Sequence, residues 1–245
     1  MKKILSLLIV SLVLSQGMNG QTTPASKNVR FGIKVAPGIS WMASDNTAKV
    51  MGAGATVKFA IGLQTEFRIT DVVSFVTGLD YMTAGGKNSY TGSDTAFYLY
   101  KDDAITKTTL SGGSISDPSG STLLASKDYR LIKRNYKIGY VHIPLSFKMK
   151  TKDIGGMTYF GQIGGDLFVR TSAKANDDVE DWSVSGHPAL TLTGVDISKQ
   201  VNIFNAGVNV GGGAEYNISG TTSLFFSLHY VHALLNTTSK TSDYL

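Results

Sequence analysis

Apolar and polar residues alternate along seven segments of the chain, and this period of two predicts β-strands. The segments span residues 30–42, 53–69, 72–84, 135–150, 157–171, 200–216 and 222–236. In the first segment, one face carries Phe31, Ile33, Val35, Ile39 and Trp41, and the other carries Arg30, Lys34 and small residues. The other six divide in the same way. Because successive side chains of a strand point to opposite sides of a sheet, each segment has one apolar and one polar face.

A transmembrane β-barrel explains these segments better than a soluble β-sandwich, which also alternates. The segments reach or exceed the roughly 9–11 residues that cross a bilayer on a tilt. Their polar faces carry charges and glycines in mid-strand, as a small hydrated lumen would. Tight connections at 70–71, 151–155 and 217–221 alternate with longer ones at 43–52, 85–134 and 172–199. Short periplasmic turns alternate with longer external loops in barrels of this kind, so we predict an all-β, antiparallel transmembrane β-barrel.

The N-terminus has the organisation of a secretory signal peptide. Lys2 and Lys3 precede an apolar run at 4–14, and a polar stretch of small residues follows. The run is too short for a transmembrane helix, which needs about 20 apolar residues. We therefore expect a signal peptide over 1–20, a linker over 21–29 and the barrel domain over 30–245.

The overall composition excludes several classes of protein. The absence of Cys excludes a disulfide framework, a thiolate metal site and a lipid anchor on an N-terminal Cys. The net charge of +5 comes without a block of Lys or Arg, so we expect no nucleic-acid partner. We also expect no cofactor. The expected partners are outer-membrane lipid and lipopolysaccharide, with other envelope proteins as further candidates, and the oligomeric state stays open.

Seven is an unexpected strand number, because bacterial barrels of this type have an even count. Residues 237–245 have the composition of an external loop and not of a returning strand. We expect that the sequence stops one strand short of an eight-stranded barrel. Alternatively, segments 98–100 with 106–110, or 189–197, form hairpins within the loops, although each hairpin keeps the count odd.

Residues 140–150, Tyr-Val-His-Ile-Pro-Leu-Ser-Phe-Lys-Met-Lys, carry a family resemblance. The segment resembles the PorT-like outer-membrane β-barrel family of Bacteroidota, which shows a Tyr-Leu-x-Ile-Pro-Leu-x-x-Lys strand in mid-barrel. The matching positions are Tyr140, Ile143, Pro144, Leu145 and Lys148. Segments 31–40, 211–216 and 224–236 are similar to other strands of that family, whose closing strand has no counterpart here. The resemblance implies an eight-stranded barrel in the outer membrane. It also implies that a few relatives serve type IX secretion or gliding.

The polar faces bring many charged residues to the expected lumen. These are Arg30, Lys34, Lys58, Glu66, Arg68, Asp80, Lys148, Asp166, Arg170 and Glu215. Eight strands enclose only enough space for side chains, and charges in that space must pair or meet water. We expect a salt-bridged network there. The alternative is a narrow ion path lined by the same charges.

Residues with catalytic or metal-binding potential are few. The best Ser–His–acid candidate is His229 beside Ser227 and Glu215, but ordinary lumen histidines are commoner. His229 and His232 lie three apart, on opposite faces of a strand, so they lack the spacing of a metal pair. We therefore predict that the protein is not an enzyme and has no catalytic, cofactor or metal residues.

The loop at 85–134 is the best candidate for specific surface contact, because loops beyond about 12–15 residues are usually functional or disordered. Its aromatic residues are Tyr90, Phe97, Tyr98, Tyr100 and Tyr129. The alternative is a variable loop without a ligand. In the loop at 172–199, the acidic stretch 177–181 is either a divalent-cation site or simply solvated.

Together these patterns predict a non-enzymatic small outer-membrane barrel whose external loops carry a binding or structural role. The alternatives are an accessory component of a type IX secretion or gliding complex, an outer-membrane lipid- or peptide-processing enzyme, and a pore.

Overall fold

The computed structural model describes residues 28–43, 50–90, 96–100, 104–111, 114–116, 129–181, 184–219 and 222–238; for 96–116 it describes the backbone alone. The expected signal peptide, residues 1–20, lies outside this part of the chain. Of the expected linker, only the end is described, where Val29 already begins the first strand.

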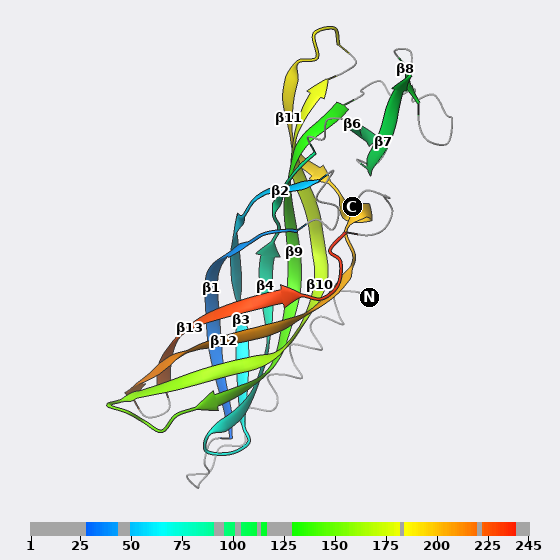
Figure 1. Cartoon of the computed structure of the whole chain (residues 1–245). Helices are drawn as coiled ribbons and strands as arrows, with labels where there is room; N and C mark the ends of the chain where they lie inside the picture. The colour runs from blue at the N-terminus through cyan, green and yellow to red at the C-terminus, as the bar shows by residue number, and fades with distance from the viewer. Residues whose placement is uncertain are drawn as a thin grey trace, which may run out of the picture.

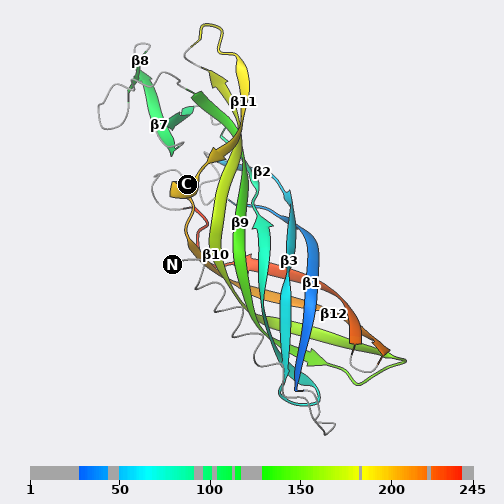
Figure 2. The same cartoon turned by 180° about the vertical axis from the view of Figure 1, so that it is seen from behind.

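Seven long strands form one antiparallel sheet in the order β1-β3-β4-β9-β10-β12-β13. Their bounds are β1 (Val29–Ser40), β3 (Thr56–Arg68), β4 (Val73–Ala84), β9 (Tyr129–Lys150), β10 (Met157–Asp181), β12 (Phe204–Ser219) and β13 (Thr222–Ala233). Figures 1 and 2 show that the sheet curls until β12 and β13 face β1 and β3 across the interior. Each of the seven predicted segments forms one of these strands, so the all-β antiparallel prediction is confirmed. Among the described residues, no helix is long and apolar enough to cross a membrane.

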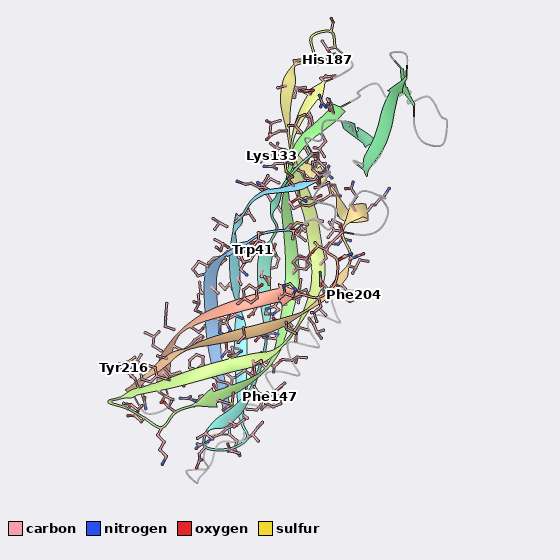
Figure 3. All side chains as sticks on the ribbon, viewed as in Figure 1. Trp41, Lys133, Phe147, His187, Phe204 and Tyr216 are labelled. Carbon is pink, nitrogen blue, oxygen red and sulfur yellow. The ribbon has the colours of Figure 1, made fainter. Side chains whose placement is uncertain are left out.

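The outer face of the sheet is apolar, as the alternation predicts. Side chains assigned to the lipid side are exposed or half-buried, with Phe31 at 83 % and Leu228 at 81 % exposed. We call this band the apolar belt. Figure 3 shows Trp41 and Phe204 near one end of the band and Phe147 and Tyr216 near the other. A soluble protein does not leave so large an apolar patch in water, and the interior of the sheet is charged, so the belt fits a bilayer and excludes the soluble sandwich.

Strands β9 and β10 continue well beyond the apolar belt and support further strands. Short strands β2 (Met51–Gly54), β5 (Lys87–Ser89), β6 (Ala96–Tyr100) and β11 (Ala189–Asp196) pair along this extension. We call residues 129–138 and 172–181, together with these four strands, the external sheet. Beyond it, β7 (Ala104–Ser111) pairs with β6 and with β8 (Ser114–Ser116).

The prediction of long loops at 85–134 and 172–199 is therefore wrong. The alternation inverts at the end of the belt, because outside a bilayer the outer face of a strand becomes polar and the inner face apolar. Tyr136 and Ile138 point inward there, and Lys133 and Lys137 point outward. A search for strands with an outward apolar face therefore misses the parts of β9 and β10 beyond the belt. Of the two hairpin alternatives, β6 with β7 is observed, whereas β11 pairs with β10.

The two edges of the sheet, β1 and β13, run in the same direction, because seven antiparallel strands separate them by an even number of steps. Their side chains meet at both ends of the opening. Arg30 Nη2 donates to Ser223 Oγ at 3.0 Å, and the rings of Trp41 and Tyr230 lie 6.4 Å apart. Within the described residues no backbone ladder joins these two strands. Of the segment expected to begin a further external loop, 237–245, only residues 237 and 238 are described, and Thr238 forms an isolated β-bridge with Val201.

Two bulges interrupt the ladder between β9 and β10, at Arg170/Ser172 and at Asp178/Val179. Pro144, in the middle of β9, causes no bulge. The β4–β9 pairs Thr77↔Leu145 and Asp80↔His142 flank it in the same register. The ladder is only interrupted there, because proline has no N–H to donate.

Ile163→Arg and Ile154→Arg test the apolar belt as a matched pair. The two isoleucines are almost equally exposed, at 56 % and 60 %, but only Ile163 lies in the belt, whereas Ile154 lies in the β9–β10 turn. We expect Ile163→Arg to lower the free energy of unfolding by about 2–4 kcal/mol, the cost of an arginine near the bilayer midplane. Ile154→Arg should leave it almost unchanged. Urea titration in lipid vesicles, followed by heat-dependent gel migration, measures both. Equal stability of the two variants would contradict a lipid-facing belt.

Candidate functional site: two lumen clusters and the external sheet

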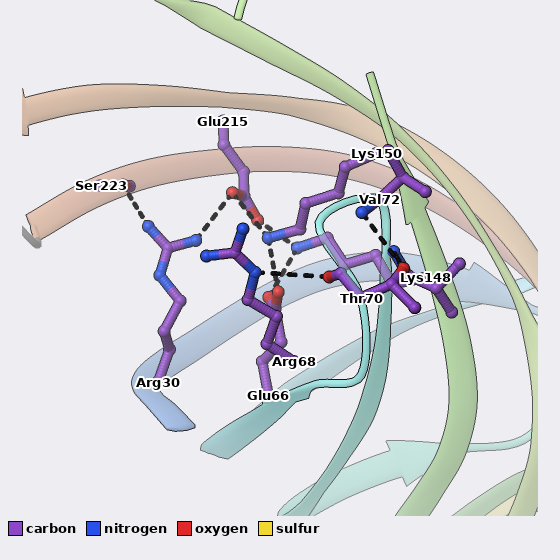
Figure 4. A network of polar contacts seen from close by, with 10 residues as sticks. Arg30, Glu66, Arg68, Thr70, Val72, Lys148, Lys150, Glu215 and Ser223 are labelled. Atoms are coloured by element: carbon purple, nitrogen blue, oxygen red, sulfur yellow. Dashed lines mark hydrogen bonds and ion pairs between the residues drawn. The ribbon is translucent and has the colours of Figure 1, made fainter. Parts of the chain in front are cut away.

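The first lumen cluster joins five strands at the end of the barrel that has the short turns (Figure 4). It consists of Arg30, Glu66, Lys148, Lys150, Glu215 and Ser223. Lys148 Nζ lies 3.2 Å from Glu66 Oε2 and also contacts Glu215, and it sits 4.0 Å above the ring of Phe160. Arg30 Nη1 reaches Glu215 at 3.2 Å. These charges are held in pairs across the interior, where either sign alone would be costly to bury.

The second lumen cluster lies further along the interior and centres on His142. Its Nδ1 is 3.0 Å from Asp80 Oδ2 and its Nε2 is 3.0 Å from Asp166 Oδ1. Lys34 pairs with Asp80, and Asn209 Nδ2 donates to Asp166 at 2.8 Å. A neutral imidazole has one N–H, so it donates to both carboxylates only as the imidazolium. Alternatively, one of the two carboxyl groups holds the proton.

Three of the ten charged residues assigned to the lumen take no part in its two clusters. The exposed Arg68 bonds Thr70 O and Asp71 within the β3–β4 turn, because its long side chain reaches water at the strand end. Within the described part of the chain, Lys58 and Arg170 make no ion pair, although Lys58 lies within electrostatic reach of Asp166. Lys150 was missed, yet it shares its face with Lys148, so the same parity would have found it.

The structure does not assemble the Ser–His–acid candidate. Glu215 is engaged by Lys148, Lys150 and Arg30. His229 stands opposite Gly211 and Ser227 opposite Gly213, and no hydrogen bond between His229, Ser227 and Glu215 occurs among the described residues. In the same part of the chain, no group of three or more His, Cys, Asp or Glu could hold a metal ion.

A buried ion pair holds the external sheet together. Arg134 on β9 donates from Nε and Nη2 to the two oxygens of Asp177 on β10, each at 2.7 Å, and from Nη1 to Gln200 Oε1 at 2.8 Å. Both charged side chains are fully buried. Burial disfavours the charge on Arg134, but the hydrogen bonds and charge of Asp177 outweigh it and raise the pKa of Arg134. This bidentate geometry fixes β9 and β10 relative to each other.

The aromatic residues proposed for surface contact are not all on the surface. Tyr90 is 2 % exposed, and its hydroxyl lies 2.9 Å from that of Tyr136. It packs with Val50, Leu131 and Val179, with Tyr129 partly buried at the edge of this core. A surface role for Tyr90 is therefore excluded, because the strands of the predicted loop enclose it. The side chains of Phe97, Tyr98 and Tyr100 lie outside the described part.

The acidic stretch 177–181 lies on a strand, and its side chains are divided between two faces. Asp177 is buried against Arg134, whereas Asp178 accepts from Thr191 Oγ1 at 3.0 Å and Glu180 pairs with Arg130 at 3.2 Å. The alternation separates these carboxylates, so they do not form the cation site considered from the sequence.

Substitution of Lys148 tests the first lumen cluster. Lys148→Met leaves Glu66 and Glu215 with fewer cationic partners, so we expect a loss of about 3–5 kcal/mol in the free energy of unfolding. Adding Glu215→Gln should recover part of that loss. Arg68→Met is the control, because its exposed pair with Asp71 contributes little. Urea-dependent gel migration measures all variants. A Lys148→Met protein as stable as Arg68→Met would overturn the importance of the cluster.

Alkaline titration tests the core of the external sheet. Burial raises the pKa of Tyr90 well above 10 and also raises the pKa of Tyr136. When the sheet opens, both phenols return to a pKa of about 10. Above that pH the open form releases protons that the closed form keeps, so stability falls as pH rises.

We therefore expect tyrosinate absorbance at these two residues to appear together with protease cleavage of the external sheet. The difference spectrum against Tyr90→Phe isolates one of the two signals. Ionisation near pH 10 while the sheet still resists protease would contradict the burial of the pair.

Comparison with known proteins agrees with the geometry. The family described as "Outer membrane protein beta-barrel domain" matches residues 16–239, which include every strand from β1 to β13. No curated protein and no solved structure matches the chain. The match also places the protein in the outer membrane, in agreement with the apolar belt and the charged interior. The chain therefore belongs to the outer-membrane β-barrel domain family.

Proposed function

We propose that this protein is a non-enzymatic outer-membrane barrel whose lumen is closed by ion pairs and whose external sheet presents a binding or structural surface. Outer-membrane barrels place their short turns in the periplasm, so the extension of β9 and β10 lies outside the cell. The paired side chains of both lumen clusters occupy the interior of the barrel, where an open channel would contain water. The barrel then serves as a membrane anchor for the external sheet.

The observation that carries the proposal is the Arg134–Asp177 pair. A loop without a ligand has no need of a buried bidentate ion pair and a core of its own. Here both charges are fully buried, and Tyr90, Leu131 and Val179 form an apolar core in the same sheet. Buried charges of this kind are commonly retained where they fix one arrangement of strands. A rigid platform for binding is the use that such order supports best.

The resemblance to PorT-like proteins supports a place within this family. Of the motif residues, Tyr140, Pro144 and Lys148 point inward and Ile143 and Leu145 point to the lipid. Tyr140 packs edge-on against Phe168, with ring centroids 5.9 Å apart, where the interior changes from charged to apolar. The motif thus has one face toward lipid and another that spans the charged and the apolar parts of the interior. We propose the PorT-like assignment on this basis.

Cross-linking and co-purification from native membranes test the proposed role, with two variants that differ in one buried charge. Arg134→Met leaves Asp177 buried without its partner and should open the external sheet, whereas Arg134→Met with Asp177→Leu replaces the pair by apolar groups. We expect wild type and the double variant to retain the same envelope partners and the single variant to lose them.

Heat-dependent gel migration checks that all three barrels fold. Identical partners for all three, or none for any, would overturn a role for the external sheet. Partners drawn from a large secretion or gliding assembly would identify the protein as an accessory component of that machinery.

A further inference from the structure

Three hydroxyl groups converge on the outer face of the barrel where the apolar belt ends. Gly139 has no side chain there, and a Cβ atom at this position would lie 2.6 Å from Ser172 Oγ, 2.9 Å from Tyr81 Oη and 3.0 Å from Thr171 Oγ1. Within the described residues none of these hydroxyls has a hydrogen-bond partner. The three hydroxyls therefore lie close together over Gly139, which is buried beneath them.

The bulge in β10 creates this arrangement. The register shifts between Arg170 and Ser172, so that Thr171 is the extra residue. In an unbroken strand two successive side chains would point to opposite faces, but a bulge turns both to one side. Thr171 and Ser172 therefore share the outer face. Tyr81 pairs with Val141 one row nearer the hydrocarbon, and its side chain leans along the sheet until its hydroxyl reaches Gly139.

Two lysines stand directly beyond the three hydroxyls. Lys137 and Lys174 are register partners on β9 and β10, and both are exposed. Like charges directly opposite each other destabilise a sheet. Neither lysine forms an ion pair within the described part of the chain. Asp196 is the register partner of Lys174 on β11, and its carboxylate accepts from Ser198 N at 2.8 Å. An anion between the two ammonium groups would relieve their repulsion.

The depth of this constellation corresponds to lipid headgroups. Lys137 is four residues beyond Val141 of the belt, about 13 Å along the strand at ~3.3 Å per residue. With the usual strand tilt this is roughly 10 Å above the hydrocarbon, at the level of headgroups. Tyrosines are enriched at such interfaces, with the ring toward the acyl chains and the hydroxyl toward water. Figure 3 shows Lys133, further along the same strand, beyond the end of the belt marked by Trp41.

We propose that Tyr81, Thr171, Ser172, Lys137 and Lys174 bind a phosphate group of a lipid in the outer leaflet. The hydroxyls donate to phosphate oxygens over Gly139, and the two ammonium groups neutralise the charge. The site continues without a break into the belt at Val141 and Val169, so acyl chains of the same molecule cover apolar surface. This continuity identifies the occupant as a phospholipid or phosphorylated glycolipid and not as free phosphate. The proposal rests on the outer-membrane placement and is independent of any partner of the external sheet.

Native mass spectrometry of the folded protein in detergent tests the site, with diphosphorylated lipid A as the probe. Lys137→Gln with Lys174→Gln should weaken binding by about tenfold or more, since each lysine near anionic headgroups contributes of the order of a fivefold change. Gly139→Ala should weaken it as well, because the methyl group would occupy the point where the hydroxyls meet. Lys133→Gln is the matched control. It lies on the same face four residues further from the belt, opposite Asp178, and should bind as wild type does.

Two further measurements identify the source of the phosphate. Dephosphorylated lipid A should not be retained, and millimolar inorganic phosphate should not displace the phosphorylated lipid. The proposal is overturned if the double lysine variant binds as wild type does, if the dephosphorylated lipid binds equally well, or if inorganic phosphate competes. Heat-dependent gel migration shows whether each variant is folded, and unchanged partner capture separates failure of this site from failure of the external sheet.

Discussion

Backbone N–H and C=O groups within a bilayer have no water to bond, so each must find its partner in the chain itself. The ladders between neighbouring strands from β1 to β13 meet this requirement everywhere except at the two edges, and they fix the register on which everything else depends. Once the register is set, the parity of each residue decides whether it meets lipid or lumen. The belt and the two lumen clusters are two results of one pairing. The edges β1 and β13 are held close by Arg30 with Ser223 and by Trp41 with Tyr230.

The interior changes from charged to apolar along its length, and this change divides the protein into two parts. His142 and Lys148 lie where the outside is hydrocarbon, so polar groups can be enclosed only by pairing with one another. Tyr136 and Ile138 lie where the outside is water, so the enclosed side becomes apolar. Strands β9 and β10 pass through both environments without ending. On the same strands, the barrel therefore encloses charged side chains and the external sheet encloses apolar ones.

The sequence predicted the part of the protein in which the apolar face is outermost. Phe31, Ile163 and Leu228 were assigned to lipid correctly because a period of two is sufficient there. Parity also predicted the inward position of Lys148 and Glu215, but not which charges pair, because the pairing depends on curvature between distant strands. Arg68 does not point into the lumen, because at the end of its strand the side chain reaches water and Asp71. The external sheet was missed because its apolar side chains point inward and its polar ones outward, the reverse of the barrel. A search for strands with this reversed pattern would have placed Arg134 and Asp177 on neighbouring strands.

The extra residue at Thr171 reverses which residues of β10 face inward and which face outward. Before it, even-numbered residues such as Asp166 and Phe168 face inward; after it, odd-numbered residues such as Asp177 and Val179 do. Removing that one residue would hardly alter the length of the strand. It would nevertheless exchange inside and outside for everything beyond, bringing lysine toward the core and aspartate toward water. The number of residues at this point is thus more tightly constrained than their identity, and variation among relatives should preserve spacing here even where it changes the side chains.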